Sequence, residues 1–264
     1  MKKPFFSIIT CTYNSAKFVQ KNIDSVKQQS FSDYEHVFID GCSKDKTKSV
    51  IKKYQRQAGK KVRFYQTKPQ GISHAFNFGI KKAKGKYLIH LNSDDNFADQ
   101  KVLQDVHDFL VTHDLPDWIY AKAKVINQDR KLIGIHPRRW FLQQANAYLL
   151  KFFNFIPHQT VFIKKKIFEK YGGFRENLIY AMDQEMWLRL RNKTQWLFFD
   201  RAICDYMVRE GANSSDPANL ARNRKIYKQM QQGYMNWLEF QASKLISYFI
   251  QQYNQKVFQD LVGC

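Results

Sequence analysis

Short runs of apolar and β-branched residues alternate with helix-like segments over the first hundred residues, and this alternation limits the possible fold more than any other feature. The expected strands are 5–12, 34–40, 62–66 and 87–91, and the expected helices between them are 16–29, 47–58 and 73–82, the last with Ser73 as its N-cap. Strands that alternate with helices of about ten residues form right-handed βαβ units with a mostly parallel sheet. The first half therefore predicts an α/β fold.

The pattern changes at Pro116, after a helix expected at 99–113. The following segments predict antiparallel strands, further short strands and helices. We expect these strands to extend the sheet of the first half. The expected strands are 118–123, 124–127, 131–135 and 160–163, followed by a pair at 196–200 and 203–208; residues 140–155 are helical or loop-like, 182–191 form a helix, and 218–262 form two helices.

Acidic residues stand where buried strands are expected to end. Asp94 and Asp95 follow the strand 87–91, and Asp40 ends the strand 34–40. Ligands of open α/β sheets bind outside the carboxyl ends of the strands, and Mg²⁺ or Mn²⁺ takes carboxylates together with phosphate oxygens. This arrangement indicates a site for a nucleotide diphosphate. The alternative is that residues 93–96 form a polar turn that opens the next helix.

Composition limits the class of protein, its binding partners and its cellular compartment. The 264 residues are 44% hydrophobic, enough for a full core, and the net charge of +20 favours contact with polyanions or anionic lipid, unless the basic surface is only solvated. The cysteines lack metal-type spacing, which fits a reducing cytosol. No apolar run is long enough to span a bilayer, and the N-terminus does not fit a signal peptide. The cysteines are Cys11, Cys42, Cys204 and Cys264.

Five motifs follow one another in the N-terminal part of the chain, between Ser7 and Asp95. They are Ser7–Asn14, Asp40–Thr47, Lys68–Gly79, Gly85–Tyr87 and Asn92–Asp95. In this order they resemble the nucleotide-binding half of glycosyltransferase family 2, which has the GT-A fold. The resemblance covers about residues 4–97. It implies a GT-A domain over 1–215, with a nucleotide-binding half (1–97) and an acceptor half (98–215), and a C-terminal helical extension over 216–264.

The resemblance also implies roles for individual residues around the donor. The metal, Mn²⁺ or Mg²⁺, would neutralise the departing diphosphate as a Lewis acid. The implied residues are Thr12 and Asn14 lining the nucleotide pocket, Asp40 on the base, Lys68, Gly71 and the stretch to Asn77 along the nucleotide and its phosphates, Asp94 near the ribose or donor sugar, and Asp95 as metal ligand.

A second acidic segment, residues 181–190, resembles the part of the family that carries the catalytic base. Asp183 is the implied base, and Glu185 is the alternative, because Met182 stands where the family often has a second acid. Without a catalytic role, Asp183 would be an N-cap and Glu185 would be solvated or paired with Arg189 at i+4.

Two further motifs resemble segments of bacterial members of the family. His158 and Gln159 match a pair near the donor or acceptor site, although a lone histidine is often structural. The segment 172–176 matches a glycine-containing loop before the base, where the glycines would allow a close loop over the donor sugar.

Together these features predict an inverting, metal-dependent, non-processive glycosyltransferase of bacterial surface-polysaccharide synthesis, such as lipopolysaccharide. The resemblance implies a nucleotide-diphosphate sugar as the donor, above all a UDP-sugar, and a hydroxyl of a surface glycan or a lipid-linked sugar as the acceptor. We expect a cytoplasmic location on the inner face of the plasma membrane, with the basic, aromatic tail either in the membrane interface or packed on the catalytic domain or a second subunit.

Three alternatives belong to other classes. A nucleotidyltransferase would carry a glycine-rich phosphate loop, which the segment 10–14 lacks. A nucleic-acid-binding protein would expose aromatic residues along a basic stripe, whereas most aromatic residues here fall inside strand and helix patterns, so no specific nucleic-acid partner is expected. The third alternative is an inactive GT-A-like binding protein.

Overall fold

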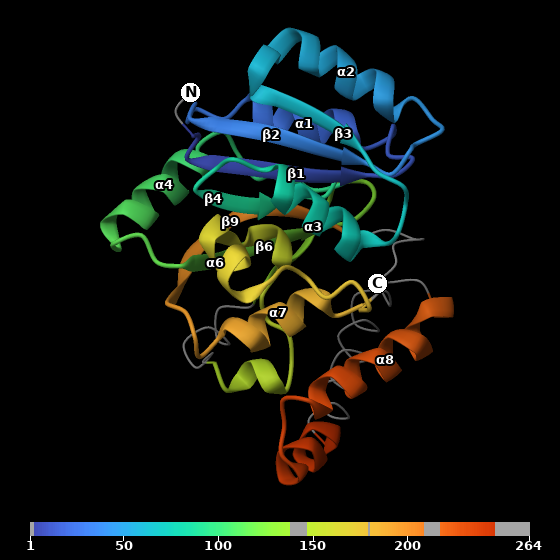
Figure 1. Ribbon diagram of the computed structural model, residues 1–264, viewed down its shortest axis with the longest axis vertical. Coiled ribbons are helices and arrows are strands. Elements are labelled where there is room, and N and C mark those ends of the chain that lie inside the picture. The colour runs from blue at the N-terminus through green and yellow to red at the C-terminus, as the bar shows by residue number, and fades with distance from the viewer. Residues whose placement is uncertain (1–2, 138–146, 179, 209–216, 246–264) are drawn as a thin grey trace.

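The computed structural model describes residues 3–137, 147–178, 180–208 and 217–245 (Figure 1). Within these residues the strands form one mixed sheet in the order β3-β2-β1-β4-β8-β6-β9-β5, with β7 paired to β6. The strands are β1 Phe6–Thr12, β2 Tyr34–Asp40, β3 Val62–Gln66, β4 Tyr87–His90, β5 Asn96–Phe97, β6 Trp118–Ile126, β7 Leu132–His136, β8 Phe162–Lys164 and β9 Trp196–Met207.

Helices cover both faces of this sheet, and most match their expected ranges. In Figure 1, α1 and α2 lie on one side of the central strands and α3, α6 and α7 on the other. The helices are α1 Val19–Lys27, α2 Thr47–Ala58, α3 Ile72–Lys82, α4 Val102–Thr112, α6 Lys165–Tyr171, α7 Met182–Leu190 and α8 Pro217–Gln232, with short 3-10 turns at Gly59–Lys61, Leu149–Lys151 and His158–Thr160.

The N-terminal half is the predicted parallel βαβ structure. β1 runs parallel to β2 and β4, and β2 runs parallel to β3. The bounds of β2, α2 and β3 are those expected from the sequence, and α1 is shorter than 16–29. The prediction that Ser73 caps α3 is wrong. Gly71, with a φ of 96°, occupies the N-cap, and Ser73 lies inside the helix.

The second half is antiparallel in part, and two strand predictions there are wrong. β7 is antiparallel to β6, as expected, and β8 is antiparallel to β4 and β6. Residues 118–126 form the single strand β6, however, and residues 196–207 form the single strand β9 parallel to it. The register of this pair shifts on both sides of Lys122, which pairs with Ala202. A bulge interrupts the alternation without ending the strand, so the sequence pattern there resembles a turn.

The core lies on both faces of the sheet and contains many aromatic side chains. Trp118 on β6 is fully buried and stacks between Trp187 of α7 and Trp196 of β9, with ring centroids at 5.2 and 5.0 Å. Helix α3 approaches the sheet closely at Gly79, where a Cβ would lie 2.4 Å from Cγ2 of Ile9. This contact fixes the position of α3 over β1, and with it the position of the helix N-terminus at the site.

The C-terminal extension divides into a packed helix and an exposed one. In α8, Met230 is buried in the core, and the amide of Gln231 donates to the carbonyls of Lys151 and Phe152. Residues 237–245 form a further helix, whose Trp237 is 71% exposed. None of the helices in the described part of the chain is long and apolar enough to cross a membrane. The rest of the predicted tail, 246–262, and residues 140–146 lie outside the described residues.

Candidate active site

A cleft of about 590 Å³ opens at the carboxyl ends of the parallel strands. Its near wall comes from the loops after β1, β2, β3 and β4, and its far wall from Tyr180 to Asp183 and from the end of β9. The structure brings several predicted residues together in its lining: Thr12, Lys68, Gly71, Asp94, His158 and Asp183.

Asp40 lies one layer behind the cleft wall. Its side chain is fully buried, and its two oxygens accept four hydrogen bonds from protein groups. The donors are the hydroxyl of Thr12 (3.0 Å), the backbone N–H and hydroxyl of Ser43 (3.0 and 2.5 Å) and the amide of Gln66 (3.0 Å). A carboxylate has about four lone-pair sites, so all are used. In this arrangement Asp40 holds the wall that presents Thr12 and Gly41 to the cleft.

Asn14 also connects loops and is not among the residues that line the cleft. Its backbone N–H donates to the hydroxyl of Ser43, and its Oδ1 accepts from the N–H of Lys44, both at 2.9 Å. The carboxylate of Asp45 accepts from the N–H groups of Ala16 and Thr47, each at 3.0 Å. Asp45 thus fastens the loop after β2 to the loop after β1, next to the start of α2, whose N-cap is Lys46.

The N-terminus of α3 opens into the cleft beside Lys68. Gly71 and Ile72, the N-cap and first residue of the helix, both line it. Unpaired N–H groups at a helix N-terminus carry partial positive charge and favour phosphate groups. Together with the lysine, this end of the helix is the positively charged part of the cleft.

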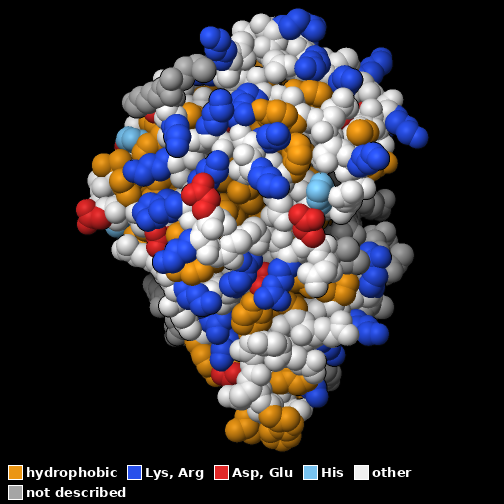
Figure 2. All heavy atoms as spheres, viewed as in Figure 1, with side chains coloured by type: hydrophobic (Ala, Val, Ile, Leu, Met, Phe, Trp, Pro, Cys, Tyr) orange, Lys and Arg blue, Asp and Glu red, His pale blue; other side chains and the backbone are white. Residues whose placement is uncertain are grey.

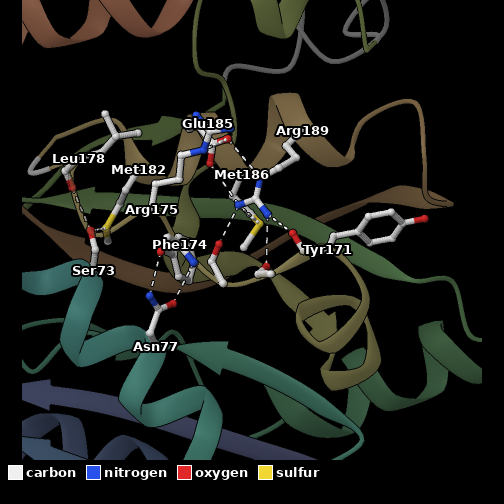
Figure 3. A network of polar contacts seen from close by, with 12 residues as sticks. Ser73, Asn77, Tyr171, Phe174, Arg175, Leu178, Met182, Glu185, Met186 and Arg189 are labelled. Atoms are coloured by element: carbon white, nitrogen blue, oxygen red, sulfur yellow. Dashed lines mark hydrogen bonds and ion pairs between the residues drawn. The ribbon is translucent and has the colours of Figure 1, made fainter.

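Asn77, predicted to lie along the nucleotide, is not among the residues that line the cleft; from one turn deeper in α3 it holds the loop 172–176 (Figure 3). Its Oδ1 accepts from the N–H of Phe174, and its Nδ2 donates to the carbonyl of Phe174 and to Glu176, at 2.8, 2.8 and 2.9 Å. A Cβ on Gly173 would lie 2.2 Å from Oδ1 of Asn77. The glycine is therefore needed for this close approach.

The neighbouring carboxylates of Asp94 and Asp95 have different environments. Asp94 lines the cleft. Asp95 is only 1% exposed, and its oxygens accept from the backbone N–H of Met207 at 3.2 Å and from the amide of Asn92 at 3.1 Å. Asn22 of α1 fixes the same loop by donating to the carbonyls of Asn92 and Asp95, both at 2.9 Å.

The donor set at this edge fits a cation that arrives with a diphosphate. Among the described residues, no three His, Cys, Asp or Glu side chains are grouped so that they could hold a metal alone. Mg²⁺ and Mn²⁺ are commonly held by one or two carboxylates and completed by phosphate oxygens. Asp94 offers such a carboxylate in the cleft, with Asp95 directly behind it.

Asp183 stands on the far wall, in the first turn of α7. The helix starts at Met182 with Ala181 as its N-cap, so the alternative that Asp183 is the N-cap is wrong. The amide of Asn154 donates to Oδ2 of Asp183 at 3.2 Å, and Nδ1 of His158 lies 3.9 Å from the same oxygen.

His158 lies between the two acidic segments. Its Nε2 is 3.1 Å from the amide nitrogen of Asn92, in the loop that carries Asp94. Burial lowers the pKa of His158, and the charges of Asp183 and Asp94 offset this only in part. A neutral imidazole that accepts at Nε2 carries its proton at Nδ1, which faces Asp183.

Glu185 and Gln159 do not line the cleft. Glu185 is fully buried and pairs with Arg189 at 3.1 Å and Arg175 at 3.0 Å (Figure 3). The hydroxyl of Tyr234 also donates to it, at 2.7 Å. The predicted i+4 pairing with Arg189 is confirmed. Arg189 also donates to the carbonyls of residues 171–173, so this pair fastens the loop 172–176 to α7. Gln159 is buried beside a smaller second pocket.

Sequence reasoning missed Tyr180 and the end of β9, Tyr206 and Met207, which complete the far wall. The available signal was that Tyr206 and Met207 belong to the short apolar run Tyr206–Val208 after Asp205. That signal could not be used without the pairing of β9 to β5 and β6, which brings this strand end to Asp95.

The mixed sheet, its flanking helices and the cleft at the strand ends define an α/β protein of the GT-A fold. Among solved structures, residues 1–349 of S. aureus TarS in complex with UDP-GlcNAc are similar, with a TM-score of 0.69 and 22% identity over 85% of this chain and 65% of that one. The mannosyltransferase PcManGT from Pyrobaculum calidifontis, in complex with GDP-Man and Mn²⁺, has a TM-score of 0.67 and 16% identity over 89% and 66% of the two chains.

The family follows from the sequence match. The model of glycosyl transferase family 2 matches residues 7–172, and the chain belongs to that family. An uncharacterized glycosyltransferase of Rickettsia typhi is 25% identical over 247 residues, 92% of this chain and 75% of the relative. A PGL/p-HBAD biosynthesis glycosyltransferase of Mycobacterium bovis is 28% identical over 182 residues, 69% and 67% of the two chains. The protein is thus a glycosyltransferase, and its family match ends before Asp183.

Proposed function

We propose that this glycosyltransferase is inverting and non-processive, and that it moves a sugar from a UDP-sugar to a hydroxyl of a surface-glycan or lipid-linked acceptor. The observation that carries the proposal is the position of Asp94 and Asp183 in one cleft, although 88 residues separate them in the chain. Both carboxylates line the cleft into which the positive N-terminus of α3 opens, where a diphosphate is favoured; Asp94 lies in the loop after β4 and Asp183 in the first turn of α7.

In the proposed reaction, the acceptor oxygen attacks the anomeric carbon from the face opposite the nucleotide. The new bond joins that oxygen to the anomeric carbon, and the bond from the anomeric carbon to the phosphate oxygen breaks. The electron pair leaves with the nucleoside diphosphate, and Asp183 takes the proton of the acceptor hydroxyl. Asn154 and His158 orient the carboxylate of Asp183 for this step. A single displacement of this kind inverts the configuration.

A divalent metal, Mn²⁺ or Mg²⁺, is part of the proposal. Asp94 and Asp95 would hold it together with the diphosphate, and it would supply Lewis-acid stabilisation of the leaving group. The Mn²⁺ bound with GDP-Man in the mannosyltransferase of the same fold supports this assignment. The UDP-GlcNAc bound to TarS supports a UDP-linked donor.

The first test is thermal unfolding with UDP, GDP, CDP and ADP, each with and without Mn²⁺. A nucleotide that binds the native state raises the free energy of unfolding by mass action, by about 2.7 kcal/mol at one hundred times its Kd, and so raises the melting midpoint. We expect a shift with UDP that requires the metal and is lost in both Asp94→Asn and Asp95→Asn. A shift that survives both substitutions contradicts the metal assignment.

The base is tested with Asp183→Asn, which keeps the size of the side chain. UDP should still raise the midpoint, while transfer should fall by roughly 10²–10⁴-fold, as expected for loss of a general base. Transfer within a few-fold of the unsubstituted protein would rule out Asp183 as the base. The configuration of the product, read by NMR of the new glycosidic bond, tests inversion.

Contact with a membrane surface belongs to the same proposal. The helix 237–245 exposes Trp237 and Leu238, each 71%, and Leu245, 64%, and Figure 2 shows hydrophobic side chains gathered at this tip of a strongly basic molecule. Apolar side chains next to basic charge favour anionic lipid interfaces. We expect co-sedimentation with phosphatidylglycerol vesicles that Trp237→Ala weakens. Equal binding to pure phosphatidylcholine vesicles would contradict an electrostatic contribution.

A further inference from the structure

A second pocket, of about 380 Å³, adjoins the cleft on the far side of Asp183. The two cavities share part of their lining, so the carboxylate of Asp183 borders both. The shared residues are His158, Tyr180, Ala181, Asp183 and Tyr206. A group placed in the second pocket would therefore reach the base from the side opposite the nucleotide, which is the side from which an acceptor must attack.

Tyrosine rings and side-chain amides dominate the wall of this second pocket. Tyr180 precedes α7, Tyr206 lies on β9 and Tyr227 lies on α8, so separate elements bring the rings together. Apolar aromatic faces pack against the C–H faces of a sugar ring, and amides exchange hydrogen bonds with its hydroxyls. The amides are those of Asn154, Gln159 and Gln184.

Tyr227 is held in place before any ligand arrives. Its hydroxyl accepts from the amide of Gln184 at 3.0 Å and contacts the carbonyl of Phe152 at 3.4 Å. A ring fixed in this way loses little conformational entropy on binding. The side-chain oxygen Oε1 of Gln184 is buried without a hydrogen-bond partner in the described part of the chain.

Charge favours a neutral ligand over an anionic one. Asp183 contributes a carboxylate to the wall, and a phosphate placed against it would be repelled, since like charges at close range cost free energy in a partly buried site.

We propose that the second pocket is the acceptor subsite, that it takes a neutral sugar residue stacked on tyrosine, and that Tyr227 makes the C-terminal extension part of this site. The proposal rests on the proposed function, because it places the acceptor hydroxyl at the same Asp183. It goes beyond that function by naming the class of acceptor group and a residue of α8 that selects it.

The test is saturation-transfer NMR with a panel of neutral methyl hexopyranosides and N-acetylhexosaminides, and with hexose 6-phosphates, in the presence of UDP and Mn²⁺. We expect a saturation-transfer signal for at least one neutral glycoside and a weaker signal for its phosphorylated counterpart. Tyr227→Ala should weaken the signal at least threefold, whereas the matched Tyr227→Phe, which keeps the ring, should retain most of it. Val125→Trp, which fills the pocket from β6 without touching the cleft, should also abolish it.

The thermal shift with UDP is measured on the same samples and separates the two proposals. A UDP shift without binding of any neutral glycoside overturns the acceptor subsite and leaves the donor site intact. If Tyr227→Ala and Val125→Trp both bind the glycoside as strongly as the unsubstituted protein does, the sugar binds elsewhere and the acceptor subsite is overturned. Stronger binding of the hexose 6-phosphates than of the neutral glycosides also overturns it. No UDP shift in the unsubstituted protein refutes the proposed function itself.

Discussion

Replacing Glu185 by Gln tests whether this carboxylate is structural, in contrast to the proposed catalytic carboxylate of Asp183. The substitution keeps the shape but removes the charge from a fully buried group that pairs with Arg189, Arg175 and Tyr234. Breaking a buried ion pair costs about 3–5 kcal/mol. Arg175 is 55% exposed and contributes little, so we expect the lower end, about 3 kcal/mol. For a chain of this size that lowers the melting midpoint by roughly 6–12 °C.

The assay compares thermal unfolding and UDP release from UDP-sugars for Glu185→Gln and Asp183→Asn. We expect Glu185→Gln to lose stability and to retain measurable transfer below its melting temperature, because the residue does not border the cleft. Asp183→Asn should melt within about 2 °C of the unsubstituted protein, since its side chain is partly exposed and makes few contacts. A Glu185→Gln protein with an unchanged midpoint and no transfer would refute this reasoning and make Glu185 the base.

Two further predictions concern the loop 172–176 and the buried histidines. Gly173→Ala should displace Asn77 and cost about 1–3 kcal/mol, while Gly134→Ala, where a Cβ meets nothing within 4 Å, should cost far less; equal midpoints would contradict the close approach. Burial lowers the pKa of His36 and of His90 to about 3, so both are neutral in the native protein and the unfolded chain binds more protons between pH 3 and 6.5. The free energy of unfolding should therefore fall with pH below about 6.5, by about 2 kcal/mol per histidine at pH 5, and less steeply in His90→Phe. Denaturant unfolding with the same stability at pH 7 and pH 5 would disprove it.

The N-terminal half could be predicted because its signals are local. The bounds of β2, α2 and β3 follow from apolar periodicity and turn residues. Because a strand was expected to end shortly before Asp94, this residue could be predicted to lie at the sheet edge, where it lines the cleft. Parallel strands deliver their carboxyl ends to one edge, so residues that follow them meet without further information. Lys68, Gly71 and Thr12 came to the cleft for the same reason.

The roles of residues within that edge depended on contacts distant in sequence. Nothing local distinguishes Asp40, whose lone pairs are used by Thr12, Ser43 and Gln66, from a carboxylate free to meet a base. Asp94 and Asp95 are likewise adjacent and chemically identical. Only the backbone of β9 at Met207, which donates to Asp95, makes one of them internal.

The sequence by itself determined the βαβ order, the parallel half of the sheet and the edge at which the acidic residues gather, because each depends on periodicity within about ten residues. The tertiary structure decided the parallel pairing of β6 with β9, the burial of Glu185, and the meeting of Asp183 with Asp94 across one cleft. It also brought Tyr227 from the C-terminal extension to the base. These arrangements depend on which surfaces pack together, and such packing is a property of the whole chain that no local pattern encodes.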